Sequence, residues 1–322
     1  MQTAAHTRRS AMQGLALARA FYNDCRPILW REMPDVMSRA AVGLVGEGSE
    51  CFGCDDAASR DHDFGPAFCL WLPREELRRH ATRIESVFGM LPQRFDGLDS
   101  RLVPERRLGR VGPLPLEDFY GFFTGLPNLP ATWQEWLAIP EYQLAACTNG
   151  EVFEDPAGGF TRWREALQGC YPRDVRLKKM AARSMVMAQA GQYNLPRCLQ
   201  RGDGLAAMLC VARFAEAALS MVYLCNGRYM PFYKWAGRLV ASLPVLGAET
   251  ARALSALAGQ PLRGVEDMEA AHMVEFLCAQ VAQHLRSEGL SDDPGDWLWA
   301  HGPQLIRRVE EPQLRQMDML QG

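Results

Sequence analysis

The sequence predicts an α+β protein in which a small α/β domain is followed by an all-α helical bundle. Between Ala41 and Leu72, short apolar runs are separated by glycine-rich and acidic loops, which is typical of buried strands. From Thr161 onward, apolar residues recur at helical spacing in segments bounded by Pro or Gly. A chain of 322 residues is long enough for two domains. The predicted divisions are an N-terminal helix packed on the core over residues 1–35, the α/β domain over 36–160 and the bundle over 161–322.

The same patterns predict the individual elements. In the first part we expect helices over residues 7–32, 74–90 and 116–123, a strand over 111–116, and a turn and strand over 148–155. In the second part we expect helices over 173–189, 205–225, 233–243, 249–257 and 266–286. The helix over 205–225 is apolar almost all round, which predicts a place in the middle of the bundle.

Composition narrows the possible partners and the compartment. The chain has 35 Lys and Arg against 38 Asp and Glu, a net charge of −3, so it has no bulk attraction for nucleic acid or an anionic membrane. The first twenty residues lack the uninterrupted apolar core of a secretory signal. The segment 205–225 contains Arg213 and Glu216, which favours a buried helix over a membrane span. We expect a cytoplasmic protein with no membrane partner, and the sequence leaves a homodimer open.

Ten cysteines are scattered through the chain, several of them among apolar residues. Reduced, buried thiols are typical of a cytoplasmic protein. Cys51 and Cys54 form a C-x-x-C pair, but no second pair stands at a zinc spacing. The cysteines therefore predict neither a disulfide framework nor a zinc site.

The most informative stretch begins with the apolar run Ala41–Val45, followed by a glycine turn in which Ser49 is suited to cap a helix. Asp61 and Asp63 then stand at the head of a second apolar run. In a strand these two side chains would project from the same face, about 6 to 7 Å apart along the backbone. Carboxylates this close tolerate each other when a divalent cation lies between them, and a glycine turn offers N–H groups to an anion. The stretch therefore predicts a site for a metal and a polyphosphate.

This arrangement resembles the signature of the nucleotidyltransferase superfamily related to DNA polymerase β: a strand, Gly-Ser, roughly ten residues, then Asp-x-Asp. Here eleven residues separate Gly48-Ser49 from Asp61-His62-Asp63. Over most of its length the chain resembles the bacterial family labelled domain of unknown function 4037, which includes the stretches GQYNLPRCLQRGD and LCNGRYMPFYKW. The resemblance implies a nucleotidyltransferase domain with a mixed sheet, but no substrate. Alternatively, the motif could be a glycine hairpin followed by a solvated Asp pair.

The resemblance implies that Asp61 and Asp63 are catalytic residues that hold Mg²⁺ or Mn²⁺, and that Gly48 and Ser49 bind the phosphates of a nucleoside triphosphate, with ATP expected. Glu47 and Glu50 flank the turn and are interpreted as surface residues because their charge would oppose phosphate. The superfamily usually supplies a third carboxylate from a later strand. The candidates here are Glu105, Glu117 and Asp118, and none of them stands in a clear strand pattern.

Further polar residues could complete the site. Lys178 and Lys179 are candidates for nucleotide binding, with a solvated helix face as the alternative. Arg101, Arg106, Arg107 and Arg110 could neutralise phosphate, although such a run is more often a solvated face. Two polar clusters in the bundle are candidates for acceptor binding or, equally, for helix caps and contacts between helices. Their members are Tyr193, Asn194, Arg197, Tyr229, Tyr233 and Lys234.

The function predicted from the sequence is metal-dependent transfer of a nucleoside monophosphate from a nucleoside triphosphate to a hydroxyl acceptor, a small molecule in the first instance. One alternative is modification of a macromolecule, either a protein hydroxyl or a tRNA end. The other is a degenerate transferase that binds nucleotide or a partner without catalysis. The lack of an evident third carboxylate is the sequence feature that supports this last alternative.

Overall fold

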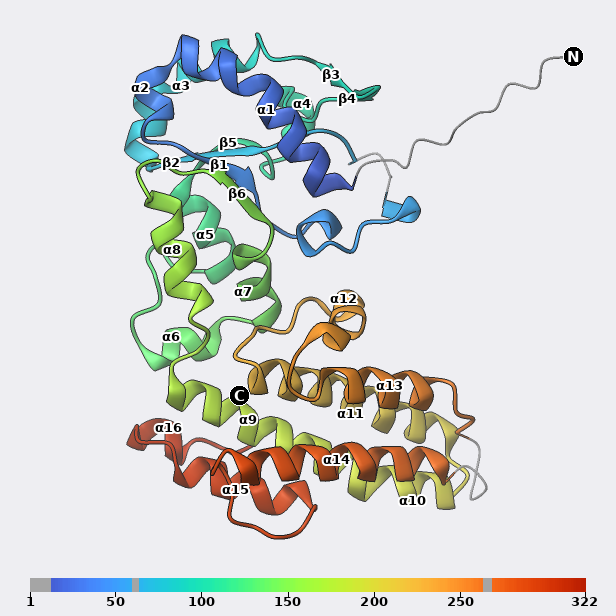
Figure 1. Ribbon diagram of the computed structural model, residues 1–322. Coiled ribbons are helices and arrows are strands. Elements are labelled where there is room, and N and C mark those ends of the chain that lie inside the picture. Colours follow the sequence, from blue (N-terminus) through green and yellow to red (C-terminus); the bar gives the residue numbers. More distant parts are fainter. Residues whose placement is uncertain (1–12, 60–63, 263–267) are drawn as a thin grey trace, which may run out of the picture. The chain divides into compact units, whose positions relative to one another are not determined.

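The computed structural model describes residues 13–59, 64–262 and 268–322 (Figure 1). It divides into two compact units. Unit 1 comprises Met1–Leu129 and Ala146–Leu167, and unit 2 comprises Pro130–Ala145 and Gln168–Gly322. The α+β class is confirmed, because unit 1 holds a mixed four-stranded sheet and the secondary structure of unit 2 is helical among its described residues. The chain was expected to divide near residue 160; the units divide after Leu167, and an earlier segment belongs to unit 2.

Unit 1 contains two sheets and the helices that cover the larger one. Its strands are β1 (Ala41–Leu44), β2 (Cys69–Leu72), β3 (Arg94–Phe95), β4 (Leu98–Asp99), β5 (Gly112–Pro115) and β6 (Glu151–Glu154). Its α-helices are α1 (Gly14–Glu32), α2 (Pro34–Met37), α3 (Arg74–Phe88), α4 (Pro104–Arg107), α5 (Leu116–Thr124) and α8 (Gly159–Gln168), of which Gln168 belongs to unit 2. Two short 3₁₀-helices follow β1: η1 (Ser49–Phe52) and η2 (Ala57–Ser59).

The four-stranded sheet has the strand order β5-β2-β1-β6. β1 pairs antiparallel with both β2 and β6, and β2 pairs parallel with β5. Every residue of β1 and β2 is buried, as expected for central strands whose apolar runs are continuous. Because β1 and β2 are antiparallel, the end of β1 and the start of β2 lie at the same edge of the sheet. Here the edge is the border formed by the strand ends and not an edge strand.

Aromatic side chains fix the helices on both faces of this sheet. Phe68, just before β2, contacts Tyr22 of α1 and Phe88 of α3 at ring distances of 5.4 and 6.0 Å. Trp71 of β2 stacks on Phe160 of α8 with its ring centroid 4.0 Å away. Residues 68 and 71 are an odd number of positions apart, so their side chains point to opposite faces. The sheet therefore lies between α1 and α3 on one side and α8 on the other (Figure 1).

Unit 2 is helical. Its elements are α6 (Trp133–Ala138), most of α7 (Glu141–Thr148), α9 (Arg173–Met187), the π-helix η3 (Ala188–Asn194), α10 (Leu195–Gln200), α11 (Gly204–Cys225), α12 (Tyr233–Leu239), the 3₁₀-helix η4 (Val240–Ser242), α13 (Gly247–Ala258), α14 (Glu269–Ser287), α15 (Leu298–Arg307) and α16 (Pro312–Gln316). α9 packs against both α11 and α15. α9, η3 and α10 follow one another without a break, so the helical segment that was predicted to end at residue 189 continues to Gln200.

Helix α11 is less buried than its composition predicts. Leu205, Met208 and Leu209 are 66%, 53% and 55% exposed, so the first half of the helix is a surface element of unit 2 and not its centre. By length and composition α11 could cross a membrane, a test that core helices of soluble proteins also pass. Its buried residues gather mostly in the second half, from Phe214 to Leu224.

Candidate functional site

The turn that follows β1 is held in place by residues from the other end of unit 1. Gly46 has φ +147°. Its N–H donates to Asn149 Oδ1 at 3.0 Å, and Asn149 Nδ2 donates to the Gly46 carbonyl at 2.7 Å. The N–H of Gly150 donates to the carbonyl of Cys51 at 2.9 Å. The segment 149–150, just before β6, thus fixes both sides of the turn.

Gly48 and Ser49 lie at the start of η1, where their positions differ from the predicted ones. Gly48 is the N-cap residue, Ser49 is the first residue of the helix, and no side chain caps it. The predicted helix cap by Ser49 is therefore wrong. Glu50 is half-buried and not a surface residue. Its side chain folds over the turn, and its carboxylate carbon lies only 2.5 Å from where a Cβ on Gly48 would stand. The other flanking glutamate, Glu47, is exposed as expected.

Asp61 and Asp63 lie outside the described residues, so their predicted roles stay predictions. The described chain resumes at Phe64, and β2 begins only at Cys69. The expected strand is therefore shorter than its apolar run. Cys69 pairs with Gly43 near the end of β1, which brings the start of β2 to the edge of the sheet where the glycine turn leaves.

Two of the three candidates for a third carboxylate lie at the opposite end of β2. Glu117 Oε2 accepts a hydrogen bond from the Arg74 N–H at 2.9 Å, and Asp118 forms an ion pair with the Arg74 side chain. Arg74 follows the last residue of β2, so the four-residue strand, about 13 Å long, separates these carboxylates from the turn. The third, Glu105, is an exposed residue of α4. Glu117 and Asp118 are therefore corrected from candidate ligands to groups at the start of α3.

One strand carboxylate near the turn was not singled out from the sequence. Glu151 of β6 pairs in register with Leu44, the last residue of β1. Its carboxylate accepts a hydrogen bond from Arg19 Nε at 3.1 Å. The alternation of Glu151–Glu154 after an Asn-Gly turn signalled the strand, but only the pairing of β6 with β1 reveals where Glu151 lies.

Lys178 and Lys179 are both buried in unit 2, which excludes a solvated helix face. Lys178 is fully buried, and its Nζ donates to the carbonyls of Met317 and Asp318. Lys179 is 4% exposed, with its Nζ 4.9 Å from the Tyr171 ring centroid. Burial lowers the pKa of Lys179 from 10.5 to about 8, against the opposing effect of Glu141. These contacts give both lysines structural partners inside the bundle.

Residues of both predicted acceptor clusters lie close to the first half of α11. Cys198, next to Arg197, has its Sγ 4.0 Å from Cys210 Sγ in the first half of the helix. Tyr229 lies four residues after the end of α11, and Tyr233 lines a cavity with Ala212, two residues from Cys210. The role of these residues in acceptor binding therefore stays a prediction.

Most of these residues contact side chains outside the two clusters. The Arg197 guanidinium stacks 3.6 Å above the ring of Tyr193, which is 46% exposed, and Asn194 lies between them in sequence. Tyr229 is buried against Tyr171 at 5.0 Å. Tyr233, 70% exposed, lines a cavity of about 310 Å³ with Glu216, Leu219 and Met230, and Lys234 lies over Trp235.

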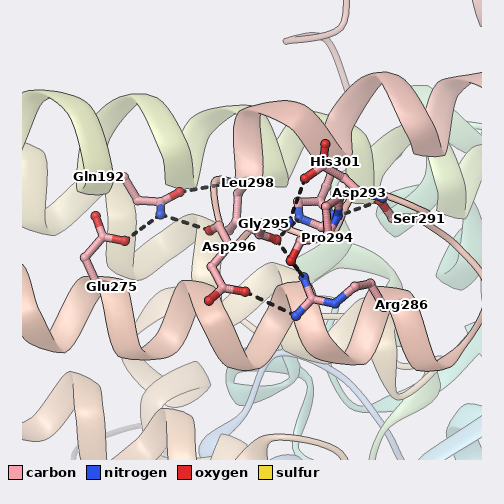
Figure 2. Close-up of polar contacts among 10 residues, drawn as sticks. All are labelled: Gln192, Glu275, Arg286, Ser291, Asp293, Pro294, Gly295, Asp296, Leu298 and His301. Atoms are coloured by element: carbon pink, nitrogen blue, oxygen red, sulfur yellow. Dashed lines mark hydrogen bonds and ion pairs between the residues drawn. The ribbon is translucent and has the colours of Figure 1, made fainter.

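Figure 2 shows the hydrogen bonds of Gln192 in η3. Gln192 Nε2 donates to Glu275 Oε2 at 2.7 Å and to the Asp296 carbonyl at 3.0 Å, and its Oε1 accepts from the Leu298 N–H at 2.9 Å. His301 fixes the same loop through the Gly295 carbonyl at 2.9 Å. Both N–H groups and the oxygen of the Gln192 amide are thus used to bind Glu275 of α14 and to anchor the loop before α15, so Gln192 is a structural residue.

No group of three or more His, Cys, Asp and Glu side chains that could hold a metal occurs in the part of the chain that the structure describes. Because the Asp61–Asp63 segment falls outside that part, the metal prediction rests on the sequence.

Comparison with known proteins matches part of the chain to the family that it was expected to resemble. Residues 136–236 match the family model described as a domain of unknown function, DUF4037. No curated protein matches the chain. A crystal structure described as a nucleotidyltransferase-like protein from Exiguobacterium sibiricum aligns with 90% of this chain and 78% of its own, at 10% identity and a TM-score of 0.34. A similarity at that level carries no argument about fold or function here.

Proposed function

We propose that this protein is a metal-dependent nucleotidyltransferase that moves a nucleoside monophosphate from a nucleoside triphosphate to a hydroxyl of a small molecule. The observation that supports this is the antiparallel pairing of β1 with β2. It brings the Gly48-Ser49 turn and the start of β2, which follows Asp61 and Asp63 in the sequence, to one edge of the sheet. The glycine turn and the segment that leads into β2 therefore lie at the same end of the sheet.

In this proposal the N–H groups and hydroxyl of the turn bind the β- and γ-phosphates. The acceptor hydroxyl loses its proton to water as its oxygen forms a bond to the α-phosphorus, the bond between that phosphorus and the bridging oxygen breaks, and pyrophosphate leaves. Asp61 and Asp63 offer the hard oxygen ligands that Mg²⁺ or Mn²⁺ requires, and the bound cation would neutralise charge on the phosphates. ATP is the first triphosphate to test.

The position of the carboxylates favours a second candidate, a protein that binds nucleotide without transferring it. β5, the strand parallel to β2, has the sequence Gly-Pro-Leu-Pro, and Glu117 and Asp118 lie at the far end of the sheet. Glu151 lies beside the end of β1, but Arg19 binds it. A missing general base typically lowers the rate by 10²- to 10⁴-fold.

A thermal-shift panel tests the binding step common to both candidates. Each of the four nucleoside triphosphates is added with Mg²⁺, with Mn²⁺ or with a chelator. A ligand present at a hundredfold excess over its Kd stabilises the folded state by about 2.7 kcal/mol. We expect stabilisation only with triphosphate and cation together. No shift under any condition would contradict both candidates.

A second experiment separates the two candidate functions. The protein is incubated with labelled triphosphate and with extracted metabolites, RNA and protein. Pyrophosphate release with label on a small molecule supports the proposal. Label on RNA or protein, detected by intact mass, would show that the acceptor is a macromolecule and not a small molecule. Binding without pyrophosphate release supports the non-catalytic candidate.

A further inference from the structure

Arg101 is a buried cation at the same edge of the sheet. It is 8% exposed, and its N–H donates to the carbonyl of Pro66, just before β2, at 3.1 Å. Its Cγ lies 3.4 Å from where a Cβ on Gly65 would stand, so the side chain rests on this glycine. Arg101 therefore lies against the segment that joins Asp63 to β2, and it is not part of a solvated face.

The Arg101 guanidinium has a distant charged partner in Glu50. Its Nη1 lies 3.8 Å from Glu50 Oε1. A distance of 3.8 Å is too long for a hydrogen bond. A guanidinium carries five N–H donors in a fork that matches the oxygens of phosphate, and buried donors are normally paired.

The carboxylate opposite Arg101 lies directly on the glycine turn. Both Glu50 oxygens are 2.5 Å from where a Cβ on Gly48 would stand, and the Glu50 Cβ is 2.7 Å from the corresponding position on Gly14 of α1. Gly48 and Gly14 thus leave room for this side chain, which substitution by alanine would remove. Glu50 places a negative group beside the turn that receives phosphate in the proposed function.

We propose that Arg101 binds the polyphosphate of the nucleotide and that the Glu50 carboxylate occupies the place of a phosphate until the nucleotide displaces it. This inference rests on the proposed function and adds a recognition residue and a competing internal anion to that site. Phosphate and carboxylate cannot both lie beside Gly48 without strong repulsion. Phosphate offers Arg101 the paired hydrogen bonds that Glu50 does not make at 3.8 Å.

The test measures the Kd of Mg²⁺–ATP and of inorganic tripolyphosphate by titration calorimetry for three variants. Glu50→Gln removes the competing charge, and we expect it to tighten binding of both ligands about tenfold. Arg101→Gln removes the hydrogen-bonding fork, and we expect it to weaken both between about 10-fold and 100-fold. Glu75→Gln is the matched control, because it also removes one negative charge from unit 1 but lies exposed on α3, and it should change neither Kd.

A double variant separates a direct contact from a general charge effect. If Glu50 competes for Arg101, the gain from Glu50→Gln disappears in an Arg101→Gln background. Arg101→Lys covers the case in which Arg101→Gln fails to fold, and we expect it to bind less tightly than the parent while keeping the charge. Circular dichroism checks each fold.

The outcomes distinguish this inference from the function on which it rests. If the parent binds nucleotide but Glu50→Gln binds no tighter, or Arg101→Gln binds equally well, the inference is wrong and the proposed function stands. If the parent binds neither ATP nor tripolyphosphate with any cation, both are wrong. Loss of thermal stability in both variants with unchanged Kd would assign the pair a structural role.

Discussion

At the scale of single residues, the structure changes what Ser49 is expected to do. Its side chain caps no helix, so Ser49→Ala should leave the free energy of unfolding unchanged. If its hydroxyl binds a phosphate oxygen, the variant should lose about 1.5 to 3 kcal/mol of nucleotide binding, roughly a 10- to 150-fold rise in Kd. Chemical denaturation and calorimetry measure the two quantities on the same protein. A loss of stability with an unchanged Kd would remove Ser49 from the site.

Lys179 gives a pH-dependent prediction. Burial holds its pKa at about 8 in the folded state against 10.5. Between these values the unfolded chain binds the proton and the folded chain does not, so stability rises with pH in this window. Below pH 8 the buried charge is a constant penalty on the folded state.

Lys179→Met removes that penalty and keeps the pairing of Glu141 with Arg183 at 3.0 Å. We expect the variant to be more stable than the parent at pH 7 by a few kcal/mol, at about 1.4 kcal/mol per pKa unit. The difference should narrow as the pH rises from 8 toward 10.5. Urea denaturation of both proteins across this range measures it, and a difference that does not depend on pH would show that Lys179 is not shifted.

At the scale of elements, Gly150 is the most constrained residue of the turn before β6. Gly150 has φ +59°, and a Cβ there would stand 2.0 Å from the carbonyl oxygen of Leu44 in β1. Gly150→Ala should therefore cost more than the strain of a left-handed backbone, which is about 1 kcal/mol.

Gly158 provides the matched control for this change. It has φ +66°, but its Cβ would meet only the end of the Arg162 side chain at 3.7 Å. Gly158→Ala should cost the backbone strain alone. Thermal denaturation compares the two variants, and equal losses would contradict the tight contact between the turn before β6 and the end of β1.

The strands show how far sequence patterns reach. Ala41–Leu44 and Cys69–Leu72 were both expected as buried apolar runs, because local composition determines whether a short segment is buried. The start of β2 could not be predicted, because the pairing length is set by its partner β1. The contact between Asn149 and Gly46 spans 103 residues and leaves no local signal. Arg101 was noticed only as a member of a basic run, since its burial depends on Gly65 and Glu50.

At the scale of the whole molecule, the expected order of an α/β part and a helical part was correct, but the segment Pro130–Ala145 belongs to the helical unit. Its contacts explain this. Glu141 is buried and binds Arg183 and Ser220, and Trp136 packs against Tyr171. A short polar helix before a predicted strand gives no sign in the sequence that its partners lie up to 79 residues later.

The acceptor site is the part that the sequence could not supply. Polar residues that follow two different helices look alike in the sequence, and nothing in it shows that Tyr233 lies beside Ala212 in the first half of α11. Of the two clusters, the one after α11 lines a cavity through Tyr233 and Met230. The pattern of residues thus identified unusual positions without indicating which of them share a pocket.

The central claim is that the edge of the sheet where β1 ends binds a triphosphate together with a divalent cation. The most direct measurement is calorimetric titration of Mg²⁺–ATP into the parent, Asp61→Asn, Asp63→Asn and, as a control, Asp118→Asn, whose side chain pairs with Arg74 at the far end of β2. We expect binding by the parent and the control, no cation-dependent binding by the first two variants, and a folded state no less stable after each of those two changes, because two like charges repel. Equal binding of Mg²⁺–ATP by all four proteins would contradict the account.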